Sequence, residues 1–488
     1  MNWKVIIALF VCHFGYSQIE MGNLYEEMPM DSVFPLSVSD HSAIRPAIRP
    51  STFHSKNKIS FNLMQRDSND GAGFFISPIF DAGMSIDNSI AYRAGLGFNL
   101  SSENMKKWSY NLSVVQGNGE SSSSFFQPKS YSFHRNNATE FSYTDIRGRV
   151  SYSHNKVFNF QTGIDHNFIG EGNRSMLLSD YGKPYPFAKI KANFWHFEYM
   201  MLYQFFREEA PDNKWKSKYS SSHLISWNAT KWLNFGVFET VIFAPRDTTL
   251  NRGYDVEYLN PIVFYRPQEY SMGSSDNILL GLQFSAKYKK HTLYGQAILD
   301  EFLLSEIRAR SKWWGNKYGG QLGIKGRFTR EQQHFFYRVE SNFGRPYLYS
   351  HSSASQNYGN QGYSLTHPYG SSFAELLGEL KWQNKNWNLK LFMSYFTHGS
   401  DKNDTVSYGG DIFKSYNLRP EEYNHTIGQG VKNSGVRMVI TAAYVVDRKT
   451  NLQFFIENHI NGNTTLKQSD YQAVVGIRSC LWNDYRNY

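Results

Sequence analysis

The stretch 471-YQAVVGIRSCLW-482 lies close to the last residue, Tyr488, and its side chains alternate between apolar and polar. Successive side chains of a β-strand point to opposite faces, so one face of this strand is apolar and the other is polar. The apolar face holds Tyr471, Ala473, Val475, Ile477 and Leu481. The polar face holds Gln472, Gly476 and Arg478. This pattern, followed by an aromatic terminal residue, is typical of the closing strand of an outer-membrane barrel.

The same alternation recurs along most of the chain. It is clearest in 90-IAYRAGLGFNL-100, where one face holds Ile90, Tyr92, Ala94, Leu96, Phe98 and Leu100. Before the closing strand we expect strands over residues 57–65, 90–100, 108–117, 146–154, 157–165, 193–206, 223–232, 234–243, 278–288, 291–299, 318–328, 335–343, 373–382, 387–396, 435–446 and 452–460. Single-chain bacterial barrels have even strand numbers, so the sequence predicts an all-β fold, a transmembrane antiparallel β-barrel of the outer membrane with roughly 16 to 18 strands.

Composition argues against a helical membrane protein and against a soluble β-protein. A membrane-spanning helix needs about 20 mostly apolar residues in succession, and none occurs after residue 17. The mean hydropathy is -0.52, yet aromatic residues make up 17% of the chain, which fits lipid-facing strands with aromatic girdles. A soluble sandwich or propeller is the alternative. It lacks support, because no blade-length repeat is visible and the last strand would form an unprotected edge.

The N-terminus is typical of a secretory signal. Lys4 precedes the apolar stretch 5-VIIALFVC-12, and the small residue Ser17 is followed by Gln18. We therefore expect a signal peptide over residues 1–17, a periplasmic or lumenal lead-in over 18–56 and the transmembrane barrel over 57–488. Lipidation at Cys12 is the alternative to cleavage. After cleavage Cys480 is the one cysteine left, so no internal disulfide is expected.

Three long connections stand out between the expected strands: residues 118–142, 344–372 and 398–434. They are rich in Tyr, Asn, Ser, Gly and His. This mixture supplies the stacking faces and hydrogen-bond donors that sugar rings require, and it equally suits ordinary solvated loops. Composition alone does not decide between the two.

Four separated stretches resemble those of Wzi-like capsule-assembly barrels, and more narrowly of RemB-like gliding-motility proteins. They are 167-NFIGEGNRSMLLSDYGKPYPF-187, 259-LNPIVFYRP-267, 293-LYGQAILDEF-302 and 356-QNYGNQGYSLTHPYGSS-372. The resemblance covers residues 145–488. It implies an outer-membrane protein without enzymatic activity that binds or organises surface polysaccharide, or that serves gliding motility, surface adhesins or secretion. The implied partners are lipid, lipopolysaccharide, surface polysaccharide and gliding or secretion machinery.

These stretches contain the candidate ligand or lumen residues. They are Gly170, Glu171, Gly172, Arg174, Ser175, Asp300, Glu301, Tyr358, Gln361 and Tyr363. Glycines allow a tight chain reversal, so 170–175 is either an inward structural turn, in which Glu171 and Arg174 could pair, or a charged ligand site. Asp300 and Glu301 follow an expected strand, and they would not share one site if the chain stays extended there.

No motif for catalysis, a metal or a cofactor is recognisable: there is no H-E-x-x-H, Walker loop, EF-hand loop or G-x-S-x-G. A hydrolase with Ser and His at the rim is an enzyme alternative that rests on residue availability alone. The formal net charge is +9, which attracts anions such as acidic polysaccharide or lipopolysaccharide phosphates, while nucleic acid is not an expected partner at a cell surface. A passive diffusion porin for small anionic or sugar solutes is the main alternative function, and it requires an open lumen.

Overall fold

The computed structural model describes residues 18–21, 41–50, 60–63, 73–85, 91–103, 107–121, 127–209, 215–245, 253–260, 276–447, 450–463, 465 and 468–479. The expected signal peptide, residues 1–17, lies outside these ranges. So do residues 22–40 of the expected lead-in, 261–267 of one family-like stretch and Leu481 of the expected closing strand.

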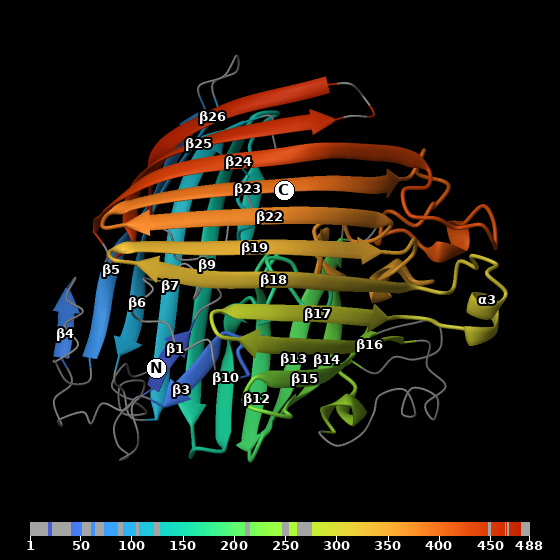
Figure 1. The fold of residues 1–488 in the computed structure, drawn as a ribbon, viewed down its shortest axis with the longest axis horizontal. Coiled ribbons are helices and arrows are strands. Elements are labelled where there is room, and N and C mark those ends of the chain that lie inside the picture. The colour runs from blue at the N-terminus through green and yellow to red at the C-terminus, as the bar shows by residue number, and fades with distance from the viewer. Residues whose placement is uncertain are drawn as a thin grey trace.

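Eighteen antiparallel strands form one closed barrel within the described ranges (Figure 1). They are β5 (Gly73–Ser85), β6 (Tyr92–Glu103), β7 (Trp108–Glu120), β9 (Glu140–Ser153), β10 (Phe158–Asp165), β12 (Tyr185–Phe194), β13 (Phe197–Glu209), β14 (Trp215–Asn228), β15 (Leu233–Phe243), β16 (Asn277–Tyr288), β17 (His291–Leu299), β18 (Tyr318–Arg330), β19 (Gln333–Gly344), β22 (Phe373–Asn384), β23 (Trp387–Ser400), β24 (Val431–Asp447), β25 (Leu452–Asn463) and β26 (Gln468–Ser479). Pairing of β26 with β5 closes the ring. The predicted fold class is confirmed.

Short elements accompany the barrel. The short strands are β1 (Gln18–Met21), β2 (Ile44–Arg45), β3 (Ala47–Pro50), β4 (Ser60–Leu63), β8 (Ser132–Arg135), β11 (Phe168–Ile169), β20 (Gly359–Asn360) and β21 (Tyr363–Ser364). The described helices are α3 (Leu304–Arg308) and the 3-10 turns η4 (Val256–Leu259), η5 (Ala354–Gln356) and η6 (Tyr416–Leu418). None of these helices has the length and apolar character that a membrane crossing requires.

Two strand predictions were wrong. The described part of the expected strand 57–65, residues 60–63, forms β4, which runs parallel to the start of β5 and so does not supply the first antiparallel strand. The antiparallel series instead begins with β5, where Phe75 and Ile79 are apolar residues on the inward face and obscure the alternation. Residues 193–206 are not a single strand either. The chain reverses at Trp195, whose φ is +53°, and this turn separates β12 from β13.

The barrel is apolar outside and polar inside. In β26, Tyr471 is exposed, whereas Arg478 points inward and its Nη2 donates to Glu457 Oε1 at 2.7 Å. Exposed aromatic residues gather at or beside the short turns: Trp108, Phe158, Phe194, Trp195, Trp227, Trp232, Tyr288, Phe328, Trp387 and Tyr444. An apolar belt with an aromatic girdle is the lipid-facing surface of an outer-membrane barrel, and the protein lies in the outer membrane.

The two ends of the barrel differ in the length of their connections. Short turns such as 195–196, 289–290, 331–332 and 385–386 join strands at one end, which we call the short-turn end. Longer segments, including 300–317 with α3 and 401–430, project from the other, the long-loop end, which lies on the right in Figure 1. In such barrels the short turns face the periplasm and the long loops face the outside.

Candidate functional site in the lumen and at the long-loop end

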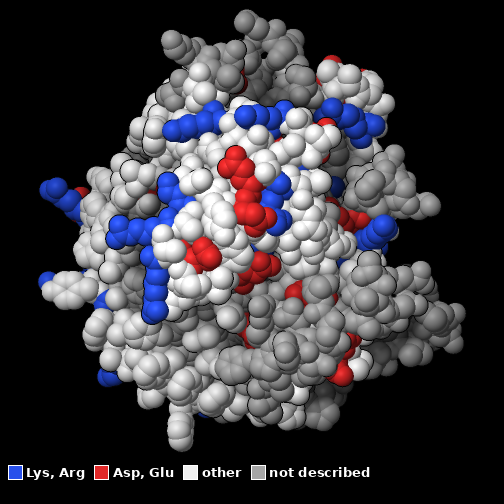
Figure 2. All heavy atoms as spheres, turned by 90° about the vertical axis from the view of Figure 1, so that its right-hand side faces the viewer, with Lys and Arg blue, Asp and Glu red and all other residues white. Residues whose placement is uncertain are grey.

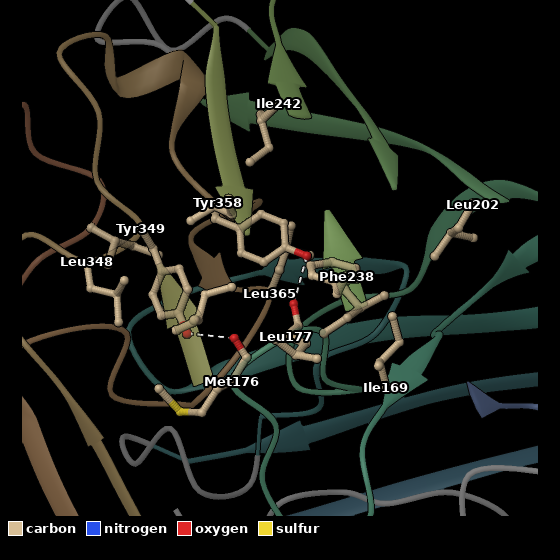
Figure 3. Close-up of a cluster of buried hydrophobic side chains, with 14 of the residues drawn as sticks. Ile169, Met176, Leu177, Leu202, Phe238, Ile242, Leu348, Tyr349, Tyr358 and Leu365 are labelled. Atoms are coloured by element: carbon tan, nitrogen blue, oxygen red, sulfur yellow. Dashed lines mark hydrogen bonds between the residues drawn. The ribbon is translucent and has the colours of Figure 1, made fainter. Parts of the chain in front are cut away.

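Two segments from the long-loop end fold into the lumen, and we call them together the plug: residues 166–184, between β10 and β12, and 345–372, between β19 and β22. Their apolar side chains share one buried cluster with inward residues of the wall. Figure 3 shows Met176, Leu177, Leu348 and Leu365 in this cluster. Residues 344–372 were expected as a long outer loop. This expectation was wrong for most of the segment, because its leucines and all of its tyrosines except the partly exposed Tyr363 are buried within the barrel.

Hydrogen bonds join the two halves of the plug. The hydroxyl of Tyr349 donates to the carbonyl of Met176 at 2.7 Å, and that of Tyr358 donates to the carbonyl of Leu177 at 2.9 Å (Figure 3). Burial raises the pKa of both tyrosines well above the ordinary value, so both stay neutral donors. Backbone carbonyls inside the barrel are thereby satisfied.

Three candidate residues of the turn 170–175 in the plug determine the path of its backbone. Gly170 has a φ of +146°, a conformation that favours glycine. A Cβ atom on Gly172 would lie 2.5 Å from the Oε2 atom of Glu340. The hydroxyl of Ser175 donates to the carbonyl of Ile169 at 2.5 Å. Each of these three candidate residues therefore shapes the inward turn.

The charged residues of this turn bind the barrel wall and do not pair with each other. Glu171 Oε2 lies 2.8 Å from Lys325 Nζ of β18, and Arg174 Nε lies 3.3 Å from Glu375 Oε2 of β22. Burial acts to raise the pKa of Glu171, but the charges of Lys325 and Lys287 and the hydrogen bonds from Lys325 and Ser42 together outweigh it and lower the pKa to about 2. Glu171 is therefore charged at neutral pH.

A second set of wall residues completes this network. Glu340 of β19 accepts hydrogen bonds from the backbone N–H groups of Asn173 and Arg174 and from the hydroxyl of Tyr294. His367 Nε2 lies 2.8 Å from Glu375 Oε2, and burial lowers the pKa of His367. The sequence analysis missed Lys325, Glu340 and Glu375. Their signal was a charged residue on the inward face of an alternating strand.

Asp300 and Glu301 share one cation, because the chain does not stay extended beyond Leu299. Asp300 Oδ1 and Glu301 Oε1 each lie 3.3 Å from Lys317 Nζ. The strand ends at Leu299, so the alternation of an extended chain no longer separates the two side chains. Burial raises the pKa of Asp300 to about 6 against the opposing effect of Lys317.

Residues 41–46 of the expected lead-in also contact the plug. Strand β2 pairs with β11, and Arg45 Nη2 donates to the carbonyl of Gly170 at 3.0 Å. The guanidinium of Arg45 lies 4.0 Å from the centre of the Phe168 ring. This stretch therefore packs against the plug from inside the barrel.

The remaining candidates lie in the second half of the plug. Tyr358 is fully buried. Gln361 lies at the turn between β20 and β21, where its backbone N–H donates to the carbonyl of Arg207 at 2.9 Å. The ring of Tyr363 packs edge-on against Tyr181, with 5.9 Å between their centres. These three residues are spread over the plug and do not converge on one point with Asp300.

Aromatic and basic side chains meet at the long-loop end, in what we call the rim cluster: Trp314, Lys317, Tyr416 and Arg419. The rings of Trp314 and Tyr416 lie 4.7 Å apart, and the Arg419 guanidinium lies 4.1 Å from the Trp314 ring. Figure 2 shows this end with acidic side chains near its middle and basic ones around them. Within the described ranges no group of three or more His, Cys, Asp or Glu side chains is placed to hold a metal ion.

Comparison with protein-family models and with curated proteins gives no match. Among solved structures the chain is similar to Wzi of Escherichia coli, "an Outer Membrane Protein Involved in Group 1 Capsule Assembly" and "a Carbohydrate Binding Beta-Barrel", with 13% identity over 83% of each chain and a TM-score of 0.54. It also aligns with OprD of Pseudomonas aeruginosa (8% identity, 83% of this chain and 94% of that one, TM-score 0.42) and with OccAB2 of Acinetobacter baumannii (8%, 84% and 97%, 0.44). At such identities, the likeness to Wzi shows the fold alone.

Proposed function

We propose that this outer-membrane barrel is a non-enzymatic protein that binds or organises cell-surface polysaccharide at its long-loop end. The observation that carries the proposal is the plug. Two segments that start at the long-loop end fold into the lumen and are held there by buried ion pairs to β18 and β22. Such a barrel presents a fixed outer surface, whereas a passive diffusion porin requires a continuous water path.

The likeness of the fold to a solved barrel also supports polysaccharide binding. One solved structure with a similar fold, Wzi of Escherichia coli, is described as carbohydrate-binding. In this chain the long-loop end offers two partly exposed side chains of the rim cluster, Tyr416 and Arg419, which suit sugar rings and acidic groups. A role resembling that of RemB-like proteins in gliding motility, surface adhesion or secretion would use the same outer surface with protein partners.

The proposal is tested with the purified barrel and polysaccharide extracted from cells that produce it. Tyr423 is exposed between Glu422, which accepts from Trp314, and Asn424, whose N–H donates to Ser311. We expect Tyr423→Ala to weaken polysaccharide binding. The matched control is Tyr288→Ala, an exposed tyrosine at the opposite end of the barrel, which should bind as the wild type does.

A second measurement separates the proposal from the porin alternative. Liposomes containing the wild-type barrel should not swell in small sugars, and swelling would support the porin. In a deletion strain, polysaccharide shed from the cells with normal colony spreading would support the proposed binding role. Retained polysaccharide with lost spreading would instead support the gliding or secretion role, and no change in either would contradict both.

A further inference from the structure

The inner wall of the barrel carries a concentrated basic surface toward the short-turn end. Four neighbouring strands, β18, β19, β22 and β23, contribute two successive layers of directly opposed side chains. The layer nearer the turns holds Arg327, Phe336, Lys381 and Lys390. The next layer holds Lys325, Arg338, Glu379 and Phe392. We call these eight residues the basic wall patch, and it has five cationic side chains and one carboxylate.

The register of these strands places like charges face to face. Lys381 pairs directly with Lys390 across β22 and β23, and Lys325 pairs with Arg338 across β18 and β19. Like charges directly opposite each other destabilise a sheet. Sheet stability therefore does not explain this arrangement.

Carboxylates from the wall and from the plug contact the patch. Glu379 lies 3.0 Å from Arg338 Nη1, and its Oε1 atom lies 3.3 Å from the ammonium groups of both Lys381 and Lys390. Lys325 is neutralised from the plug by Glu171. Glu379 and Glu171 are thus two carboxylates that contact the patch, one from the wall and one from the plug.

Arg327 carries a buried donor that the described part of the chain does not satisfy. Its side chain is buried, and its Nη1 atom has no hydrogen-bond partner within the described part of the chain. Its guanidinium lies 5.6 Å from the Phe336 ring. A buried donor without a partner is unfavourable, and the planar guanidinium matches the geometry of a phosphate or carboxylate group.

Solvent reaches the patch from the side of β23. The side chain of Lys390 is 32% exposed and that of Lys381 is 18% exposed, whereas Arg338 is buried. Both lysines lie on the hairpin strands that meet at the short turn 385–386. Because the plug holds the other side through Lys325, access is from the short-turn end, which faces the periplasm.

We infer that the basic wall patch binds an oxyanion, a phosphate or carboxylate group that enters the lumen from the periplasm. Arg327, Lys381 and Lys390 would contact the anion, and Glu379 holds the two lysines in place before it arrives. This inference does not rest on polysaccharide binding at the long-loop end, since it concerns the opposite end of the barrel.

The test is calorimetric titration of the purified full-length barrel with pyrophosphate, with glucuronate and with glucose. We expect at least one of the two anions to bind, less tightly as salt is raised, and glucose not to bind. Binding of one anion alone identifies the phosphate or the carboxylate as the ligand group. If neither anion binds, the inference is overturned.

Two lysine variants test whether the anion binds at the basic wall patch. Lys390→Gln should weaken anion binding about tenfold, the effect of losing one charge-assisted hydrogen bond. The matched control is Lys312→Gln, an exposed lysine at the long-loop end, which should leave binding unchanged. Lys390→Gln should also preserve or raise the urea midpoint, because it removes a like-charge contact. A lowered midpoint with unchanged anion affinity would make Lys390 a structural partner of Glu379 and overturn the assignment.

Discussion

Glu375 holds two parts of the plug through its one carboxylate. Arg174 reaches it from the first segment, and His367 from the second. Removing one partner of a buried ion pair leaves the other charge uncompensated, which costs about 3–5 kcal/mol. We therefore expect Glu375→Gln to lower the free energy of unfolding by about 3 kcal/mol or more. The measurement is urea unfolding of the barrel in micelles.

A surface pair provides the control for this substitution. Glu422 pairs with Arg419 at the long-loop end, where the carboxylate is exposed to water. Exposed ion pairs contribute little to stability, so Glu422→Gln should leave the urea midpoint almost unchanged. Equal losses in the two variants would contradict the assignment of Glu375 as an anchor of the plug.

Glu171 makes stability depend on pH in the acid range. Its pKa is lowered from 4.5 to about 2 in the folded protein, so the unfolded chain binds its proton first as the pH falls. The contribution of Glu171 to stability is therefore fully present above pH 4.5 and is lost as the pH falls through about 2. Between these values, urea midpoints of the wild type should fall more steeply than those of Glu171→Gln. Parallel curves would show that the pKa of Glu171 is not lowered by folding.

Among the elements, the sequence predicted strands best where one face meets lipid. The outward residues of β6 and β26 form apolar series, and water-soluble loops do not imitate such series. Strand β5 escaped prediction because the apolar side chains of Phe75 and Ile79 lie on its inward face, beside Asp81, which pairs with Arg93, so the alternation is obscured. The turn at Trp195 escaped because an aromatic residue occupies a backbone conformation usual for glycine or asparagine.

The plug could not be predicted from local sequence. Its tyrosines, asparagines and serines have the composition of a solvated loop, and only distant partners make their burial favourable. Arg174 and Glu375 are 201 residues apart in the chain, and no local pattern links them. Gly170 and Glu171 were recognised as residues of an inward turn, but the sequence did not indicate that their partners lie on β18, β19 and β22.

The plug should control whether the barrel conducts. We expect replacement of residues 170–177 by a short Gly-Ser linker to open a water path, because this removes the turn and the carbonyls that Tyr349 and Tyr358 hold. The measurement is single-channel conductance in planar bilayers. Removal of residues 402–405, which are exposed at the long-loop end, is the control and should leave the barrel closed. A wild-type barrel that conducts as well as the linker variant would contradict the closed lumen.

At the scale of the whole molecule, one chain faces two solvents. Apolar side chains point outward along the strands, while ion pairs such as Arg174 with Glu375 lie inside. A soluble protein of this size would bury its apolar residues together, and here they are divided between the plug and the lipid belt. This division explains how a chain with a mean hydropathy of -0.52 forms a membrane protein.

If the outward face of the barrel meets lipid, the loss of stability caused by an outward arginine should depend on its depth in the bilayer. Two positions on one strand test this. Leu282 and Tyr288 lie on the outward face of β16, Leu282 in its middle and Tyr288 at the short turn, with exposed fractions of 58% and 70%. Arginine costs about 2–4 kcal/mol at the middle of a bilayer and about 0–1 kcal/mol near its interface. In lipid vesicles, Leu282→Arg should therefore lower the free energy of unfolding much more than Tyr288→Arg. Tyr288 is the more exposed of the two residues. If Tyr288→Arg lowered the free energy of unfolding as much as Leu282→Arg or more, exposure alone would govern the effect. The middle of β16 would then not face hydrocarbon.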